Sequence, residues 1–153
     1  MPRAENPGAP ERAPFAYTVI RVVPRVEREE FVNAGVVLFS RPRRFLGARA
    51  GMDAARLRAL WPELDIDAVQ RQLDILGLVA AGDPSGGAIA RLSLTERFGW
   101  ISAPASTVVQ PGPVHGGLAH DPEATLDALF ASLVISSSGA KQRAALPNPE
   151  PLS

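Results

Sequence analysis

The segments Tyr17-Thr-Val-Ile-Arg-Val-Val-Pro24 and Glu27-Arg-Glu-Glu-Phe-Val-Asn-Ala-Gly-Val-Val-Leu-Phe39 hold most of this chain's polar chemistry within apolar surroundings. β-branched and aromatic residues dominate both, which is typical of β-strands. We expect strands at Phe15–Val23 and Gly35–Ser40. A third strand is predicted at Phe45–Ala50, after a turn that contains Pro and several Arg residues.

Two helices are predicted to follow these strands. Asp53 is a suitable N-cap for a short helix through Leu60, because its carboxylate can accept hydrogen bonds from the free N–H groups of the first turn. Asp65 can cap a second helix, in which apolar residues recur with helical spacing. The buried stripe of this second helix is Ile66, Val69, Leu73, Leu76 and Val79.

The last third of the chain is predicted to contain a helix, a strand and a final helix. Leu94–Trp100 forms the first helix, with Phe98 and Trp100 turned inward, and Thr107–Gln110 forms the strand. Asp121 as N-cap and Pro122 at the first helical position begin a helix that runs to Val134. Its buried stripe is Leu126, Leu129, Phe130 and Leu133.

Strands that precede helices predict an α+β fold. We expect a small, mainly antiparallel sheet of about three or four strands, covered on one face by about four helices. The 153 residues suffice for a single domain, which we place at residues 15–135. Residues 1–14 and 136–153 are rich in Pro, Ser and Gly and are predicted to be disordered tails.

Composition excludes several classes of function. The chain has no cysteine, so thiolate nucleophiles, thiolate metal sites and disulfides are ruled out. No apolar run is long enough for a membrane span or a signal peptide, and we expect a cytoplasmic protein. Residues 1–50 carry nine Arg and five Glu, and residues 51–153 carry seven basic and eleven acidic groups, so the two parts have charges of +4 and −4. The overall neutrality argues against nucleic acid as a partner, whereas the asymmetry could steer a charged protein.

The first strand contains a charged residue among apolar ones. Alternation places Arg21 on the same face as Val19 and Val23, so its guanidinium needs an acceptor. Glu30 could supply one after the intervening turn, and Asn33 could cap this turn or bond a strand edge. We expect a buried Arg21–Glu30 ion pair. The alternative is that Arg21 holds an anionic ligand in a bidentate manner.

Two histidines are the other candidates for chemistry. His115 lies in a Gly-rich loop and could act as a general base, or could bind a metal together with His120 and Asp121. Neither spacing is diagnostic, and we expect loop histidines that hydrogen-bond to the backbone. No motif of a hydrolase or of a P-loop occurs, and we predict no metal and no cofactor. The candidate binding residues are Arg21, Glu30, Asn33, Arg97, Gln110 and His115, of which Glu30 and His115 are also the candidate catalytic residues.

Several motifs along the chain resemble a bacterial family, the domain of unknown function 3037 family. Its pattern Y-x-x-x-R-x-V-P followed by E-x-x-N-x-G-V is matched by Tyr17, Arg21, Val23, Pro24, Glu30, Asn33, Gly35 and Val36. Leu94–Trp100, Ser106–Pro111 and Val114–Leu118 are also similar to the family, so the resemblance extends from Tyr17 to Val134. The family has no established activity, and the resemblance therefore implies a fold more than a function. Its members are often encoded beside HipA-like kinases, which suggests such a kinase as a partner.

Two hypotheses about function follow. The first, which we favour, is a non-catalytic module that binds another protein through an exposed sheet edge or through the face that carries Arg21, Glu30 and Asn33. The second is an enzyme or nucleotide-handling protein in which Arg21, Glu30, Asn33, Arg97 and His115 converge on an anionic substrate. Convergence of these side chains in one concave pocket would favour the second hypothesis, and dispersal would favour the first.

Overall fold

A computed structural model describes residues 11–25, 28–135 and 142–143 of the chain. The strands are β1 (Ala13–Val22), β2 (Glu30–Ser40), β3 (Phe45–Ala50), β4 (Val109–Ala119) and β5 (Gln142–Arg143). The α-helices are α1 (Ala54–Leu60), α2 (Ile66–Ala81), α3 (Leu94–Ser102) and α4 (Pro122–Phe130). Short 3-10 turns at Pro84–Gly86 and Ala88–Arg91 connect α2 to α3, and a π-helical turn at Ala131–Ile135 continues α4.

The sheet has the order β3-β2-β1-β4, and every neighbouring pair is antiparallel. β5 makes two further antiparallel pairings with Glu30 and Phe31, at the start of β2. This arrangement confirms the predicted α+β class with its mainly antiparallel sheet of about four strands and four helices.

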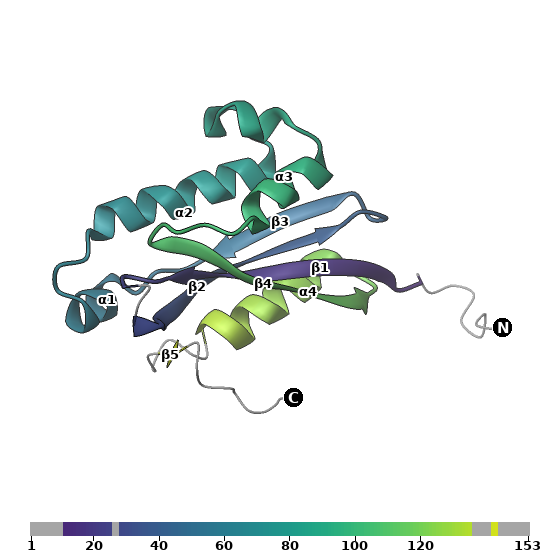
Figure 1. The fold of residues 1–153 in the computed structure, drawn as a ribbon. Coiled ribbons are helices and arrows are strands. Elements are labelled where there is room, and N and C mark those ends of the chain that lie inside the picture. Colours follow the sequence, from purple (N-terminus) through teal and green to yellow (C-terminus); the bar gives the residue numbers. More distant parts are fainter. Residues whose placement is uncertain (1–10, 26–27, 136–141, 144–153) are drawn as a thin grey trace.

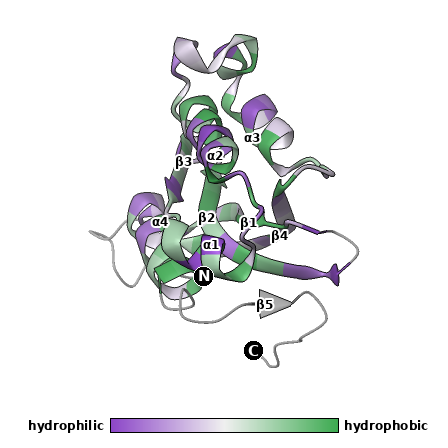
Figure 2. Ribbon diagram, turned by 90° about the vertical axis from the view of Figure 1, so that its left-hand side faces the viewer, coloured by the Kyte–Doolittle hydropathy of each residue, from purple (hydrophilic) through white to green (hydrophobic). Residues whose placement is uncertain are grey.

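Helices cover both faces of the sheet rather than one. Figure 1 shows α2 and α3 on one side of the strands and α4 on the other. Val37 belongs to the large core beneath α1, α2 and α3, whereas Val36 and Leu38 pack against Leu126 of α4 in a separate cluster. The predicted single covered face is therefore wrong in this respect. The reason is that β2 is apolar at consecutive positions, and its hydrophobic colour in Figure 2 extends over most of the strand, so both faces must be buried.

The helix starts agree with the predicted capping residues. The carboxylate of Asp53 accepts a hydrogen bond from the Arg56 backbone N–H, and Asp65 does the same for Ala68. Asp121 accepts from two backbone N–H groups at the start of α4. Each cap satisfies donors that have no partner inside the helix, which is why these boundaries could be predicted.

The largest difference from prediction is the length of β4. The sequence indicated a strand of four residues, Thr107–Gln110, followed by a loop, but β4 continues to Ala119 and pairs with β1 as far as Ala13. Two prolines and three glycines in this segment hide its strand character, because both residue types are rare inside strands. A register shift opposite Thr18 and Ile20 accommodates the irregular part of the strand.

Some predicted boundaries also move. β1 begins at Ala13, two residues before the expected start of the domain. Most of the two expected tails, residues 1–14 and 136–153, lies outside the described part of the chain, apart from residues 11–14 and the two residues of β5. α4 is α-helical only to Phe130 and then changes to a π-helical turn. Phe98 is buried as predicted, but Trp100 is 44% exposed. The reason is that α3 packs on the core with the side that carries Phe98, and Trp100 lies on another side of the helix.

We expect Leu126→Ala to destabilise the protein by about 2–5 kcal/mol, because it removes a fully buried side chain from the cluster beneath α4. Leu92→Ala is the matched control, since Leu92 is among the exposed large apolar residues. Urea unfolding of both variants measures the difference. Equal effects would contradict a second apolar core on this face.

Candidate functional site

Arg21 lies on the α4 side of the sheet, near the end of β1. Its neighbours Ile20 and Val22 belong to the core beneath α1, α2 and α3, and alternation therefore turns Arg21 to the opposite face. In the register of the sheet it is paired with Asn33 of β2 and Gln110 of β4. Directly opposed residues share a face, so these three predicted site residues lie together.

The guanidinium of Arg21 is held by an aromatic ring and by the backbone of β4. Its Cζ atom lies 4.2 Å from the centroid of the Phe31 ring, a cation–π contact. A Cβ atom built on Gly112 would come within 3.0 Å of both Cζ and Nε, so the guanidinium reaches over the edge strand where no side chain obstructs it. Burial lowers the pKa of Arg21 because it removes water from the charged group.

The expected ion pair between Arg21 and Glu30 is not formed. Glu30 shares a face with Val32, which packs in the core beneath α1, α2 and α3, whereas Arg21 and Asn33 are on the other face. The carboxylate of Glu30 instead lies 3.8 Å from Nε of Arg28. Alternation along β2 explains this outcome, because residues 30 and 33 are an odd number of positions apart.

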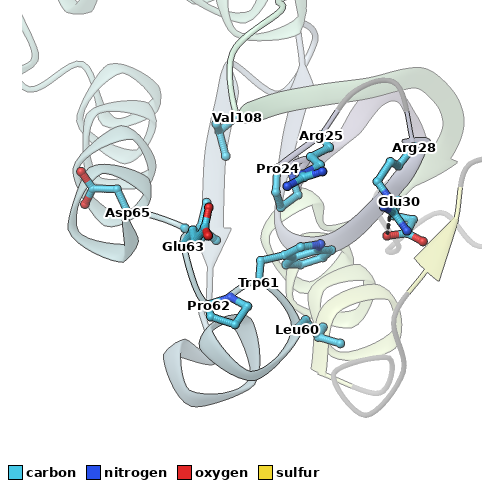
Figure 3. A pocket seen from close by; sticks show the side chains of 11 residues that line it. Pro24, Arg25, Arg28, Glu30, Leu60, Trp61, Pro62, Glu63, Asp65 and Val108 are labelled. Atoms are coloured by element: carbon cyan, nitrogen blue, oxygen red, sulfur yellow. Dashed lines mark ion pairs between the residues drawn. The ribbon is translucent and has the colours of Figure 1, made fainter.

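Glu30 borders a cavity of about 610 Å³ near the turn that joins β1 and β2. Figure 3 shows the Arg28–Glu30 ion pair on one side of this cavity and the Trp61 ring and Glu63 on another. The lining mixes basic and acidic side chains, and of the predicted candidates only Glu30 belongs to it.

Asn33 contributes to a different and smaller cavity. Its Nδ2 donates a hydrogen bond of 2.9 Å to the carbonyl of Leu133, which ties β2 to the turn after α4. Among the residues that the structure describes, its Oδ1 and Nε of Arg56 are buried without hydrogen-bond partners, and both residues line this cavity of about 260 Å³. The predicted role in capping the preceding turn is therefore replaced by a contact with the C-terminal helix.

Arg97 lies on α3, on the opposite side of the sheet from Arg21, and contacts the end of α2. It is buried on α3, and its guanidinium lies against Gly82, the residue that ends α2 in a left-handed conformation. A Cβ atom at Gly82 would approach Nη1 of Arg97 to 2.6 Å. Arg97 is thus positioned to pack the α2–α3 connection rather than to meet a ligand beside Arg21.

His115 and Gln110 lie on β4. The sequence placed His115 in a loop, but it lies in the strand, exposed and opposite Tyr17, with ring centroids 5.3 Å apart. The Nε2 of Gln110 donates to the carbonyl of Thr107. Gln110 also borders an apolar groove of about 470 Å³ between α2, α3 and the start of β4, lined by Ile75 and Trp100 among others.

The predicted candidates do not converge in one cavity. Glu30, Asn33 and Gln110 border three different hollows, and Arg21, Arg97 and His115 line none of the three. Within residues 11–25, 28–135 and 142–143, no group of three or more His, Asp or Glu residues is arranged to hold a metal ion. None of these three hollows therefore brings a candidate catalytic base together with Arg21 for a shared substrate.

Sequence reasoning missed the exposed apolar surface along β4 and the neighbouring groove. Six large apolar residues are exposed in the described part of the chain, and four of them, Ile75, Trp100, Val114 and Leu118, lie on this surface. The sequence predicts that Val114 and Leu118 follow the short strand in a loop and that Trp100 is buried. Only the pairing of β4 with β1 brings these residues to one side of the sheet.

Comparison with known proteins finds one family. The model of the family described as "Protein of unknown function (DUF3037)" matches residues 17–134, which is more than half of the chain. No curated protein and no solved structure matches. None of the α-helices in the described residues has the length and apolar character needed to cross a membrane.

The Arg97–Gly82 contact leads to a stability prediction. We expect Gly82→Ala to destabilise the protein by about 1–2 kcal/mol, because an L-residue resists the left-handed backbone and the new methyl group would displace Arg97. Gly77→Ala is the control: its Cβ would meet nothing within 4 Å, and it should stabilise α2 by about 0.5–1 kcal/mol. Thermal unfolding of both variants checks the opposite signs, and a stabilising Gly82→Ala would contradict the assigned role.

Proposed function

The chain belongs to the DUF3037 family, and we propose that it is a non-catalytic interaction module that binds an extended segment of a partner protein along β4. The observation that carries this proposal is the exposed edge of β4 beside an apolar groove. The other edge of the main sheet, β3, is shorter and lies against α2 and α4.

β4 has the properties of an edge that can accept another strand. It is 11 residues long, stands last in the strand order, and pairs within the described residues only with β1. Natural edge strands are usually blunted by charged residues, prolines or bulges. The prolines and the bulge occur in the first half of β4, whereas Val114–Ala119 contains no proline and no Lys, Arg, Asp or Glu. The second half therefore presents an unprotected row of backbone donors and acceptors.

Apolar side chains of β4 continue the groove along the same side of the sheet. Val109 is opposite Val22, Val114 is opposite Thr18, and Leu118 is opposite Pro14, so all three point to the side on which α2 and α3 lie. Val114 and Leu118 are 50% and 56% exposed. Trp100 and Ile75, across the groove, are exposed to a similar degree.

An extended peptide is the occupant that fits both features. Only another extended backbone can satisfy the outward N–H and C=O groups of an edge strand in series. Alternate side chains of such a peptide would project to the α2–α3 side, where an apolar residue can enter the groove beside Trp100. A helix could fill the groove but would leave the strand edge unpaired.

The dispersal of the candidate residues supports the module over the enzyme. Glu30 and His115, the two candidate catalytic residues, lie on different strands and different faces of the sheet. The HipA-like kinase suggested by the family resemblance is the first partner to test.

We expect Leu118→Lys to abolish capture of the partner, because a lysine on the exposed edge opposes strand addition. Leu92→Lys is the matched control, since Leu92 is an exposed leucine away from β4 and the groove. The full chain, carrying a photoreactive cross-linker at residue 116, is incubated with a purified HipA-like kinase. Cross-links should form with the wild type and with Leu92→Lys, and they should be lost with Leu118→Lys.

Three outcomes would contradict the proposal. Cross-links that persist in Leu118→Lys would remove β4 as the binding edge. A two-fold dimer in solution that Leu118→Lys dissociates would make a second copy of this chain the occupant instead. Turnover of a phosphate ester or nucleotide that is lost in His115→Ala, with the fold retained, would favour the enzyme hypothesis.

A further inference from the structure

We infer that Arg21 is the anchor for a carboxylate on the bound protein segment; this inference rests on the proposed binding along β4. The segment would then alternate in character, with an apolar side chain in the groove on one face and an acidic side chain over Arg21 on the other. Within the described residues Arg21 has no charged partner, its guanidinium is held in one position, and it reaches across β4.

The charge of Arg21 is not compensated within the described part of the chain. Its guanidinium makes no hydrogen bond or ion pair there, and its Nε is buried with no acceptor. The cation–π contact with Phe31 is the polar interaction that remains. Burying a charge without a paired acceptor is unfavourable, and the lowered pKa of Arg21 reflects the same loss of hydration. An anionic group on a bound partner would offset this unfavourable free energy of burial.

The position of the guanidinium is fixed before any partner binds. Phe31 packs against one part of it at 4.2 Å, and Gly112 lies directly beneath Cζ and Nε. Because these contacts restrict the long side chain, little conformational entropy is lost when an anion binds. Any side chain at position 112 would push the guanidinium away, so the glycine is what allows this placement.

The same contact directs the guanidinium toward the proposed binding edge. Arg21 is on β1, but its head group lies over Gly112 of β4, the outermost strand. A strand added to β4 would lie about 4.8 Å further out. Where a segment paired with Val114–Ala119 continues past Val114 toward Gly112, its side chains on the α4 side would pass beside the Arg21 head group, while the intervening ones would face the groove.

A carboxylate fits this position better than a phosphate. Arg21 offers a single positive charge and a planar fork, which matches one carboxylate in a bidentate manner. Its cross-strand neighbours, Asn33 and Gln110, carry neutral amides. A phosphate dianion would need further positive charge to offset its desolvation, and these neighbours do not supply any.

The test uses the isotope-labelled full chain and sodium acetate as the probe. The Arg21 Nε–H and Gly112 backbone N–H resonances are followed by NMR during titration with acetate, with chloride and inorganic phosphate at equal ionic strength. We expect saturable shifts with acetate that are at least tenfold larger than those with chloride. At Gly112 they should be lost in Arg21→Lys, which keeps the charge but not the fork, and retained in Arg58→Lys, the control at an exposed arginine of α1.

Stability provides a second measurement. Arg21→Met should leave the melting temperature unchanged or higher, because it removes an uncompensated charge while retaining apolar contact with Phe31. A melting temperature lower by many degrees would overturn the inference in favour of a structural role. Tighter binding of phosphate than of acetate would overturn the choice of carboxylate, and the absence of saturable acetate shifts would overturn the anchor itself. The cross-linking with Leu118→Lys is independent of these results, so failure of the anchor and failure of β4 binding can be told apart.

Discussion

The structure depends on the burial of both faces of β2. Val36, Val37 and Leu38 are consecutive and almost completely inaccessible to solvent, so each face of this strand must be covered by its own layer. The helices α1, α2 and α3 supply one layer, and α4 supplies the other. On the second face of the sheet, α4 packs against β2 and β3 but covers less of β1. The part of this face near β4 therefore remains partly exposed to solvent.

This uneven cover determines where polar groups can lie. Phe15, Tyr17 and Arg21 are half-buried on the open part of the α4 face. Glycines on the neighbouring strand make room for two of them: a Cβ atom at Gly117 would approach the Phe15 ring to 2.8 Å, and one at Gly112 would meet the guanidinium of Arg21. The glycines of β4 therefore serve packing of β1 side chains, although they weaken the strand signal in the sequence.

A shift in the pairing of β1 with β2 determines which polar side chains lie on this surface. The register between β1 and β2 shifts between Ile20 and Arg21, which keeps Arg21 opposite Asn33 instead of Ala34. Beyond this bulge, Glu30 falls on the other face and pairs with Arg28. The result is an arginine without a carboxylate partner in the described residues, next to an edge strand. Bulges commonly redirect a side chain in this way near binding surfaces.

The sequence by itself determined the fold class, the first three strands, the helix starts and the family. These features depend on local chemistry: β-branched runs, Asp residues that cap free N–H groups, and short motifs. It also named Arg21, Asn33 and Gln110 among six candidate binding residues, but it could not show which face of the sheet each one occupies. Tertiary structure alone decided that α4 covers the second face, that Arg21 and Glu30 are apart, and that Val109–Ala119 forms one long edge strand. The physical reason is that pairing with β1, across more than 85 residues of sequence, overrides the weak strand propensity of proline and glycine. This pairing fixes the register on which every shared face depends.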